Sequence, residues 1–254
     1  MYIDAHIHAD VRSYEDFGRM ALAGIEKAVT CAHDVYRMST SDVYFDHYDR
    51  LLRAETQKAG KNGVELFVAL GVHPRAIPKD ASKIIRELPK FLDNKKVVAI
   101  GETGLDRVDK REVEMLKKQM EVCVKTDLPI IVHTPTKGKS GAIDEILHLV
   151  ETTGVDPRKV VIDHVNGEVV EKVIDRETYI GLSIQPPSKL SHLEVAKIIE
   201  DYGASKFMLN SDMSSIASDP LAIPRTALEM KKMGISKGRI RKVSYDHASA
   251  FFGL

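Results

Sequence analysis

Six histidine and carboxylate side chains in this 254-residue sequence are suited to bind metal, and each stands at or near the end of a short apolar run. They are His6, His8, Glu102, His133, His164 and Asp212. Gathered at one buried place, such groups would be desolvated and the carboxylates would repel each other unless a cation balanced them. Four imidazoles with two carboxylates favour a transition ion, zinc first, with manganese or magnesium as alternatives.

Six ligands are more than a single catalytic zinc requires, because such a zinc takes three from the protein. We therefore expect one or two ions per chain, two being the better fit, with Glu102 between them. A bound metal lowers the pKa of water to about 7, which makes hydroxide available to attack a carbonyl carbon or a phosphorus. Asp212 is the expected catalytic proton acceptor.

The elements that must position these residues alternate between short apolar runs and amphipathic stretches. Strands are predicted at 2–8, 28–33, 66–73, 97–102, 129–133, 159–164, 179–185 and 206–212. Helical spacing follows them, as in 112–126 and 192–202. Strict alternation means parallel pairing, so residues 1–254 predict a single (β/α)8 TIM barrel, with a doubly wound open sheet as the alternative. The carboxyl ends of all barrel strands converge at one mouth, where the six residues can meet.

Two local features carry further expectations. In the first strand, Asp4, His6 and His8 should share one face, because side chains alternate along a strand. Asp4 would then fix a histidine tautomer, or else make a hydrogen bond at the start of the strand. The region that follows the second strand, 34–63, is long and polar, and we expect it to carry a loop over the barrel mouth.

Charge and composition limit the class of protein. Lysine plus arginine and aspartate plus glutamate number 37 each, which argues against a constitutive nucleic-acid partner. No apolar run is long enough to span a membrane, and a secretory leader pattern is missing, so we expect a cytoplasmic protein without a membrane partner. The 2 cysteines, Cys31 and Cys123, are expected to be reduced and buried.

Taken together, several motifs resemble TatD-type metal-dependent hydrolases of the amidohydrolase superfamily. They are Asp-x-His-x-His at 4–8, Gly-x-His-Pro at 71–74, Gly-Glu-x-Gly-Leu-Asp at 101–106, the two later single histidines and the aspartate of the last strand. The Gly-Glu-x-Gly-Leu-Asp element is the most specific of them. The resemblance extends from residue 4 to residue 254 and implies a (β/α)8 barrel whose one or two metals activate water.

Carried over residue by residue, the resemblance implies a role for each ligand. His6 and His8 would hold the first metal with Asp212, and Glu102 would bridge. His133 and His164 would hold the second metal. Members of the family are known as nucleases or are assigned simply as hydrolases.

Three departures from the family pattern suggest a divergent subgroup. Pro135 stands where an arginine is frequent, and Met213-Ser214 follow the last ligand where the family has another pair. His247 replaces a usual asparagine. The metal-binding residues are thus retained while the substrate-facing ones differ, so nuclease activity does not follow from the resemblance.

Three further residues are predicted to contact substrate. His73 lies in a loop that Gly71 and Pro74 shape, and Lys137 and Lys139 follow the fifth strand on a glycine-containing loop. Backbone amides and two ammonium groups there could receive a phosphate or a carboxylate.

The predicted function is metal-dependent hydrolysis of a phosphoester or nucleic-acid-type substrate, a small molecule or an oligonucleotide. Amide or lactone hydrolysis is the alternative within the same superfamily. A non-catalytic metal-binding or ligand-binding barrel is the third hypothesis. Asp212 argues against it, because a structural zinc site closes with four ligands and needs no additional base.

Overall fold

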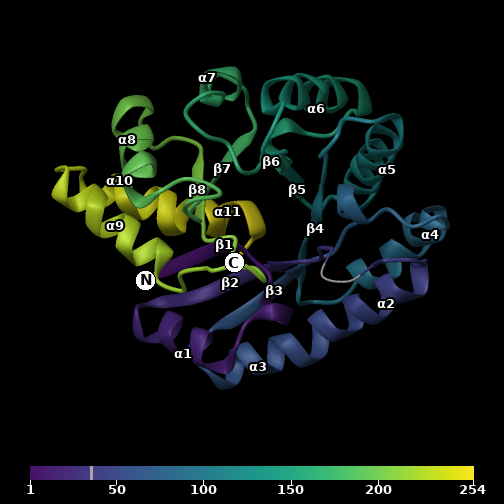
Figure 1. Ribbon diagram of the computed structural model, residues 1–254, viewed down its shortest axis with the longest axis horizontal. Coiled ribbons are helices and arrows are strands. Elements are labelled where there is room, and N and C mark those ends of the chain that lie inside the picture. The colour runs from purple at the N-terminus through teal and green to yellow at the C-terminus, as the bar shows by residue number, and fades with distance from the viewer. Residues whose placement is uncertain (35–36) are drawn as a thin grey trace.

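Eight parallel strands form the centre of the molecule within the residues that the computed structural model describes, 1–34 and 37–254 (Figure 1). The strands are β1 (Tyr2–Ile7), β2 (Ile25–Cys31), β3 (Glu65–Ala69), β4 (Val97–Gly104), β5 (Ile130–His133), β6 (Val160–Ile162), β7 (Tyr179–Ser183) and β8 (Phe207–Asn210). Neighbours along the chain are neighbours in the sheet, in the order β1 to β8. All eight strands lie within three residues of their predicted starts, and the predicted fold class is confirmed.

The barrel closes through the segment that follows β8. The Asp212 N–H donates to the His6 carbonyl at 3.0 Å, and the His8 N–H donates to the Met213 carbonyl at 2.8 Å. A parallel bridge joins Ile7 and Met213. The closing contacts thus involve the same short segments that carry His6, His8 and Asp212.

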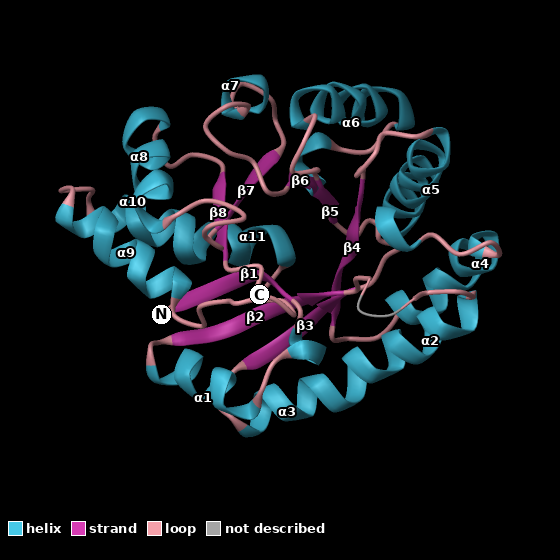
Figure 2. Cartoon of the chain, in the orientation of Figure 1, coloured by secondary structure: helices cyan, strands magenta, loops and turns pink. Residues whose placement is uncertain are grey.

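Helices surround the strands (Figure 2). They are α1 (Tyr14–Leu22), α2 (Ser41–Arg50), α3 (Thr56–Lys61), α4 (Ala81–Leu92), α5 (Lys110–Thr126), α6 (Lys139–Thr153), α7 (Val170–Val173), α8 (His192–Tyr202), α9 (Ala222–Lys232), α10 (Lys237–Arg241) and α11 (His247–Phe252). Polar caps define several starts: Ser13 and Ser191 each form a capping box, and the Asp109 carboxylate accepts from two N–H groups of α5.

The expectation of a loop at 34–63 is wrong for most of that region. Helix α2, a π-helical turn at Leu51–Glu55 and α3 follow one another without a break, which Figure 2 shows as one long helix. The buried stripe contains Tyr44, His47 and Tyr48. Tyrosine and histidine count as polar in a hydrophobicity pattern even where they are buried. The sequence pattern of this region therefore does not show the helical period. Positions 35 and 36 lie outside the described residues.

Strict alternation along β1 is also wrong. The register with β2 shifts between Asp4 and Ile7. Ile3 and Ala5 belong to a small apolar cluster with Phe251 of α11, whereas Ile7 belongs to the larger cluster beneath the helices. A shift of register changes which face a side chain takes, and the Asp4 carboxylate lies 3.5 Å from the His6 backbone nitrogen rather than at either imidazole ring.

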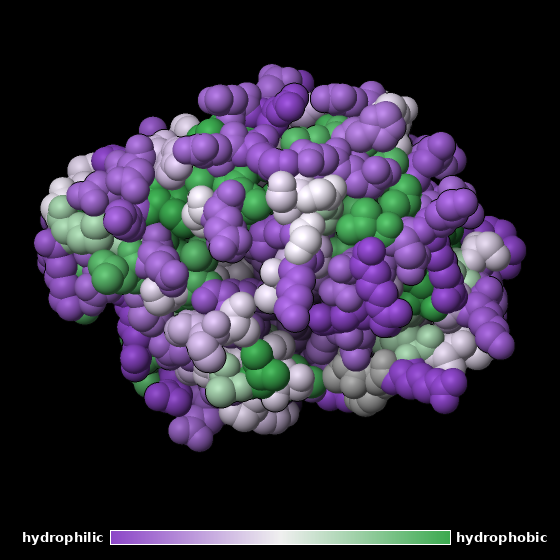
Figure 3. Space-filling view, turned by 45° about the horizontal axis from the view of Figure 1, so that its top comes forward, coloured by the Kyte–Doolittle hydropathy of each residue, from purple (hydrophilic) through white to green (hydrophobic). Residues whose placement is uncertain are grey.

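On the face shown in Figure 3, polar side chains predominate and apolar atoms lie in separate patches. No helix in residues 1–34 and 37–254 has the length and apolar character that a membrane span requires. Cys31 and Cys123 are free and buried, as predicted.

Candidate metal centre

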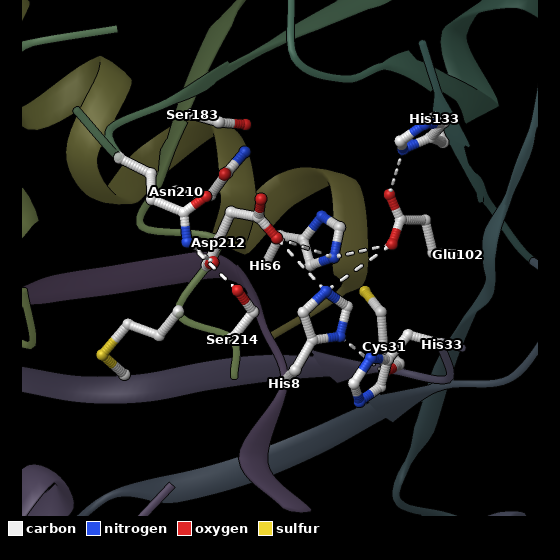
Figure 4. A network of polar contacts seen from close by, with 12 residues as sticks. His6, His8, Cys31, His33, Glu102, His133, Ser183, Asn210, Asp212 and Ser214 are labelled. Atoms are coloured by element: carbon white, nitrogen blue, oxygen red, sulfur yellow. Dashed lines mark hydrogen bonds and ion pairs between the residues drawn. The ribbon is translucent and has the colours of Figure 1, made fainter. Parts of the chain in front are cut away.

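Four of the predicted ligands face one another at the carboxyl end of the barrel (Figure 4). His8 Nε2 lies 3.2 Å from Asp212 Oδ1, and His6 Nε2 lies 3.9 Å from the same oxygen. Glu102 Oε2 lies 3.4 Å from His6 Nε2 and 3.7 Å from His8 Nε2. Ligand atoms of His6, His8 and Asp212 therefore converge on a volume small enough for one cation.

The other oxygen of Glu102 faces the remaining two predicted ligands. Glu102 Oε1 lies 2.8 Å from His133 Nδ1 and 2.9 Å from His164 Nε2. Each oxygen of this buried carboxylate thus faces a different pair of histidines. This is the arrangement that a bridging role for Glu102 requires.

Partners at Nδ1 determine which nitrogen the first two histidines offer. His6 Nδ1 lies 2.6 Å from Asp163 Oδ2, and His8 Nδ1 lies 3.2 Å from the Cys31 carbonyl. An oxygen acceptor at Nδ1 holds the proton there and leaves Nε2 with a free lone pair. Both Nε2 atoms point toward the carboxylates of the site, so the rings are oriented as metal ligands.

Asp163 is not one of the six predicted ligands, yet its carboxylate holds the His6 ring. Its Oδ1 accepts two hydrogen bonds of 2.8 Å, one from Asn210 Nδ2 and one from the backbone N–H of the next residue, His164. Gly181 leaves it room, since a Cβ at that position would overlap the carboxylate. Asp4 instead accepts from the Ser211 N–H at 2.9 Å, which ties β1 to the segment after β8.

The donor set fits a divalent cation. His6 Nε2 and His133 Nε2 are fully buried and make no hydrogen bond with the described residues. A buried polar atom without a partner destabilises the fold by about 1–3 kcal/mol. A cation coordinated by His6 Nε2 would remove that penalty at this atom, and imidazole with carboxylate is a donor set typical of zinc.

Charge in the site supports the same interpretation. Burial alone would raise the pKa of Glu102, but the imidazoles of His6, His133 and His164 hold it well below its usual range. Burial likewise opposes ionisation of Asp163, and His164 and His6 outweigh it, so its pKa is also lowered. Both carboxylates are therefore ionised at neutral pH.

Backbone strain coincides with two of the candidate ligands. His164 and Asp212 adopt the left-handed conformation, with φ of 60° and 44°. Non-glycine residues rarely do so, and such strain gathers at functional sites. In the Gly-Glu-x-Gly-Leu-Asp element, Gly104 has φ of 139°, and a Cβ there would overlap the backbone of His133. Glycine at that position lets β4 and β5 bring Glu102 and His133 together.

A cavity of about 590 Å³ opens over the site. Besides metal-site residues, its lining includes the cations Arg75, Lys139 and Lys189. Lys189 Nζ contacts Asp212 Oδ2 and lies 3.1 Å from His164 Nδ1. Lys189 follows β7 in a loop without a motif, so only the fold could identify it. Burial lowers the pKa of both lysines to about 8.

The predicted substrate contacts occupy three different settings. Lys139 lines the cavity and donates to Thr134 Oγ1 at 2.9 Å and to the His164 carbonyl at 2.7 Å. Lys137 is exposed and does not line it. His73 is buried, accepts from the Arg75 N–H at 3.2 Å and lies 3.7 Å from Glu102 Oε2. The substrate contacts of His73 and Lys137 stay predictions.

The three departures from the family pattern lie in different places relative to the cavity. Pro135 and Met213 are buried outside the cavity lining, and His247 Nδ1 lies 2.9 Å from the Phe207 carbonyl at the start of β8. Ser214 does line the cavity. Of these positions, Ser214 is therefore the one placed to meet a substrate.

Comparisons with known proteins agree with this architecture. The chain is 47% identical over 252 residues to an uncharacterized metal-dependent hydrolase of Methanocaldococcus jannaschii, covering 99% of this chain and 100% of the relative. A solved TatD-like protein of Archaeoglobus fulgidus superposes with a TM-score of 0.85 at 26% identity, covering 100% of both chains.

A more distant likeness concerns the fold alone. The phosphotriesterase homology protein of Escherichia coli, solved with phosphate in its active site, has a TM-score of 0.72 at 16% identity and covers 99% of this chain and 98% of its own. The sequence profile of the TatD related DNase family matches residues 3–253. The chain therefore belongs to the TatD related DNase family and is a metal-dependent hydrolase of that type.

Proposed function

We propose that the protein hydrolyses phosphoesters of nucleotide type with a metal-activated water. The observation that carries the proposal is Lys139. Its ammonium group is buried in the cavity wall, and it makes no ion pair with any residue in the described part of the chain. A buried cation without a carboxylate partner is a favourable place for a substrate anion.

The size of the cavity supports a small substrate or a chain end. About 590 Å³ falls within the range of small-molecule pockets, roughly 300–1,000 Å³. A nucleotide fits that volume. The balanced net charge also argues against long tracts of bound nucleic acid.

Named residues would hold the cations and move the proton. His6, His8 and Asp212 would hold one divalent ion, His133 and His164 a second, and Glu102 would contact both. When bound, the ions lower the pKa of water and offset negative charge on the electrophile. Zinc is the proposed metal because histidine dominates the donor set.

The residues of the chain supply orientation and proton transfer. Asp212 Oδ1 faces the two histidines of β1, so this carboxylate can orient the attacking water and accept its proton. Lys189 contacts the other Asp212 oxygen and can neutralise charge that develops on the departing group. Asp163 keeps His6 in the orientation that a ligand needs.

The test compares substrate classes on one metal-loaded preparation. Protein loaded with zinc or manganese would be offered bis(p-nitrophenyl) phosphate, p-nitrophenyl phosphate, short single-stranded DNA and γ-butyrolactone. We expect the phosphoesters to give the highest kcat/KM, with Lys139→Gln reducing it. Faster turnover of the lactone, with no effect of Lys139→Gln on any substrate, would overturn the proposal.

A further inference from the structure

A second cluster of histidine and carboxylate lies beside the metal centre, and the proposed mechanism does not use it. Asp10, His33 and His47 come from the turn after β1, the end of β2 and helix α2. All three are buried. Their candidate ligand atoms lie within 4.8 Å of one another, so the cluster could be taken for another metal site.

Hydrogen bonds within the cluster argue against a metal. The His33 backbone N–H donates to His47 Nε2 at 3.4 Å, so Nε2 provides the lone pair and Nδ1 carries the proton. That Nδ1 faces Asp10 Oδ2 at 4.0 Å. A protonated nitrogen cannot coordinate a cation, so in this tautomer neither nitrogen of His47 is available to a metal. The 4.0 Å separation is too long for a hydrogen bond, and His47 Nδ1 and Asp10 Oδ2 have no hydrogen-bond partner among the described residues.

The same chain of donors determines the tautomer of His33. Asp10 Oδ1 lies 2.9 Å from His33 Nε2 and accepts its proton. In neutral imidazole the other nitrogen, Nδ1, is then an acceptor. Nδ1 has no hydrogen-bond partner among the described residues, and it is not one of the fully buried polar atoms that lack a partner. His33 lines the cavity, so this lone pair meets the space where substrate binds.

The ring of His33 is held in place on several sides. It stacks on the ring of His8, with centroids 3.9 Å apart and an interplanar angle of 29°. Asp10 holds one edge, and α2 holds the backbone through His47. The neighbouring carboxylate, Asp34, is already engaged by Arg75 at 3.0 Å. His33 therefore offers a rigid acceptor on this side of the cavity.

We propose that His33 is a substrate-binding residue whose Nδ1 accepts a hydrogen bond from a hydroxyl or amino group of the substrate. Asp10 and His47 are positioning residues: Asp10 holds the ring proton on Nε2, and His47 holds the backbone of His33. The substrate then carries an anionic group for Lys139 and, on another side, a donor for His33. The choice of phosphate esters as probes rests on the proposed function.

A matched pair of ligands isolates this contact. 2-Hydroxyethyl phosphate and propyl phosphate have the same length, and only the first carries a terminal hydroxyl. Calorimetric titration of zinc-loaded protein with each ligand gives two dissociation constants, and their ratio is a selectivity that does not depend on kcat. We expect wild-type protein to prefer the hydroxyl ligand by about three- to tenfold, as one good hydrogen bond allows.

Two variants remove that preference in different ways. His33→Gln can keep a donor toward Asp10 while it loses the acceptor at the position of Nδ1. Asp10→Asn lies outside the cavity lining and can turn its amide toward Nε2, which moves the imidazole proton to Nδ1. Both variants should bring the ratio to about one while propyl phosphate binds as before. Unchanged melting temperatures would show that both variants fold.

Other outcomes would overturn the inference. An unchanged ratio in both folded variants would remove His33 from substrate binding. A third metal ion per chain by elemental analysis, lost in Asp10→Asn, would make the cluster a metal site. If neither phosphate ester binds, the proposed function fails instead. The ratio would then be measured with α-hydroxy- and α-methyl-γ-butyrolactone, and a hydroxyl preference lost in both variants would still support His33.

Discussion

Two clusters of the same residue types lie side by side at the barrel mouth and differ in the atoms that they leave free. In the metal centre, Asp163 and the Cys31 carbonyl occupy Nδ1 of His6 and His8, and both Nε2 atoms remain available. In the second cluster, the His33 backbone N–H occupies Nε2 of His47, and Asp10 occupies Nε2 of His33. The partners behind a histidine, rather than the number of histidines, decide whether a metal can bind.

The largest expected effect comes from Glu102, the residue that touches both halves of the metal centre. Wild-type protein should contain close to two divalent ions per chain. Glu102→Ala or His6→Ala should lower this to one or none and reduce hydrolysis by about 10³-fold or more. His47→Gln should retain the metal. Elemental analysis measures the metal content of wild type and of each variant. Wild-type protein that binds neither zinc nor manganese would contradict the metal centre.

Asp212 separates chemistry from folding. Asp212→Asn should reduce kcat by about 10²- to 10⁴-fold, because the amide cannot accept a proton from water. The melting temperature should move by only a few degrees, since groups at the barrel mouth lie outside the packed core. Scanning calorimetry and steady-state kinetics provide the two readings. Outright unfolding would assign Asp212 a structural role.

A substitution of Asp163 tests how much metal affinity depends on the hydrogen bond that holds the His6 ring. Asp163→Asn can present an amide where His6 needs an acceptor, so the affinity for metal should fall by about 10- to 100-fold. Asp10→Asn is the matched control in the second cluster and should leave metal affinity unchanged. Competition with a chelator gives both affinities. Equal affinities for the two variants would remove the difference between the clusters.

The second cluster should make the free energy of unfolding depend on pH. Burial lowers the pKa of His47 from 6.5 to about 4. Between these values the unfolded chain binds a proton that the folded chain excludes, so stability falls as pH falls. The loss is about 2 kcal/mol at pH 5.

Urea unfolding of wild-type protein and His47→Gln at about pH 7.5 and pH 5 measures this effect. The stability advantage of the wild type should shrink by about 2 kcal/mol at the lower pH, because glutamine does not titrate. A difference that stays constant between the two pH values would show that His47 keeps an ordinary pKa.

The smallest expected effect concerns the two lysines after β5. Lys139→Gln should raise KM for anionic substrates several-fold and leave metal content unchanged, because an ammonium group is not a ligand. Lys137→Gln should have little effect, since its exposed charge is screened by salt beyond roughly 8–10 Å. Added salt should reduce the difference in KM between wild type and Lys139→Gln. The KM for neutral esters should be the same in both proteins. Equal KM values for all variants would remove Lys139 from substrate binding.

Local patterns in the sequence determined the strand order and the place of the main candidate ligands. Eight short apolar runs separated by amphipathic stretches suffice to predict a parallel barrel, because each strand and each helix has its own period. His6, His8, Glu102, His133, His164 and Asp212 stand at strand ends, and all strand ends of a barrel meet at one face. The site could therefore be located without knowing any distance.

Only the tertiary structure decided how these residues are supported. Asp163 reaches His6 across 157 positions of the chain, and Lys189 reaches Asp212 across 23. The register shift in β1 and the helix at α2 depend on what packs against them, since Tyr44 and Tyr48 are buried although tyrosine reads as partly polar. Tautomers likewise depend on partners brought from other elements. The sequence identified candidate ligands, and the fold decided which nitrogen each of them offers.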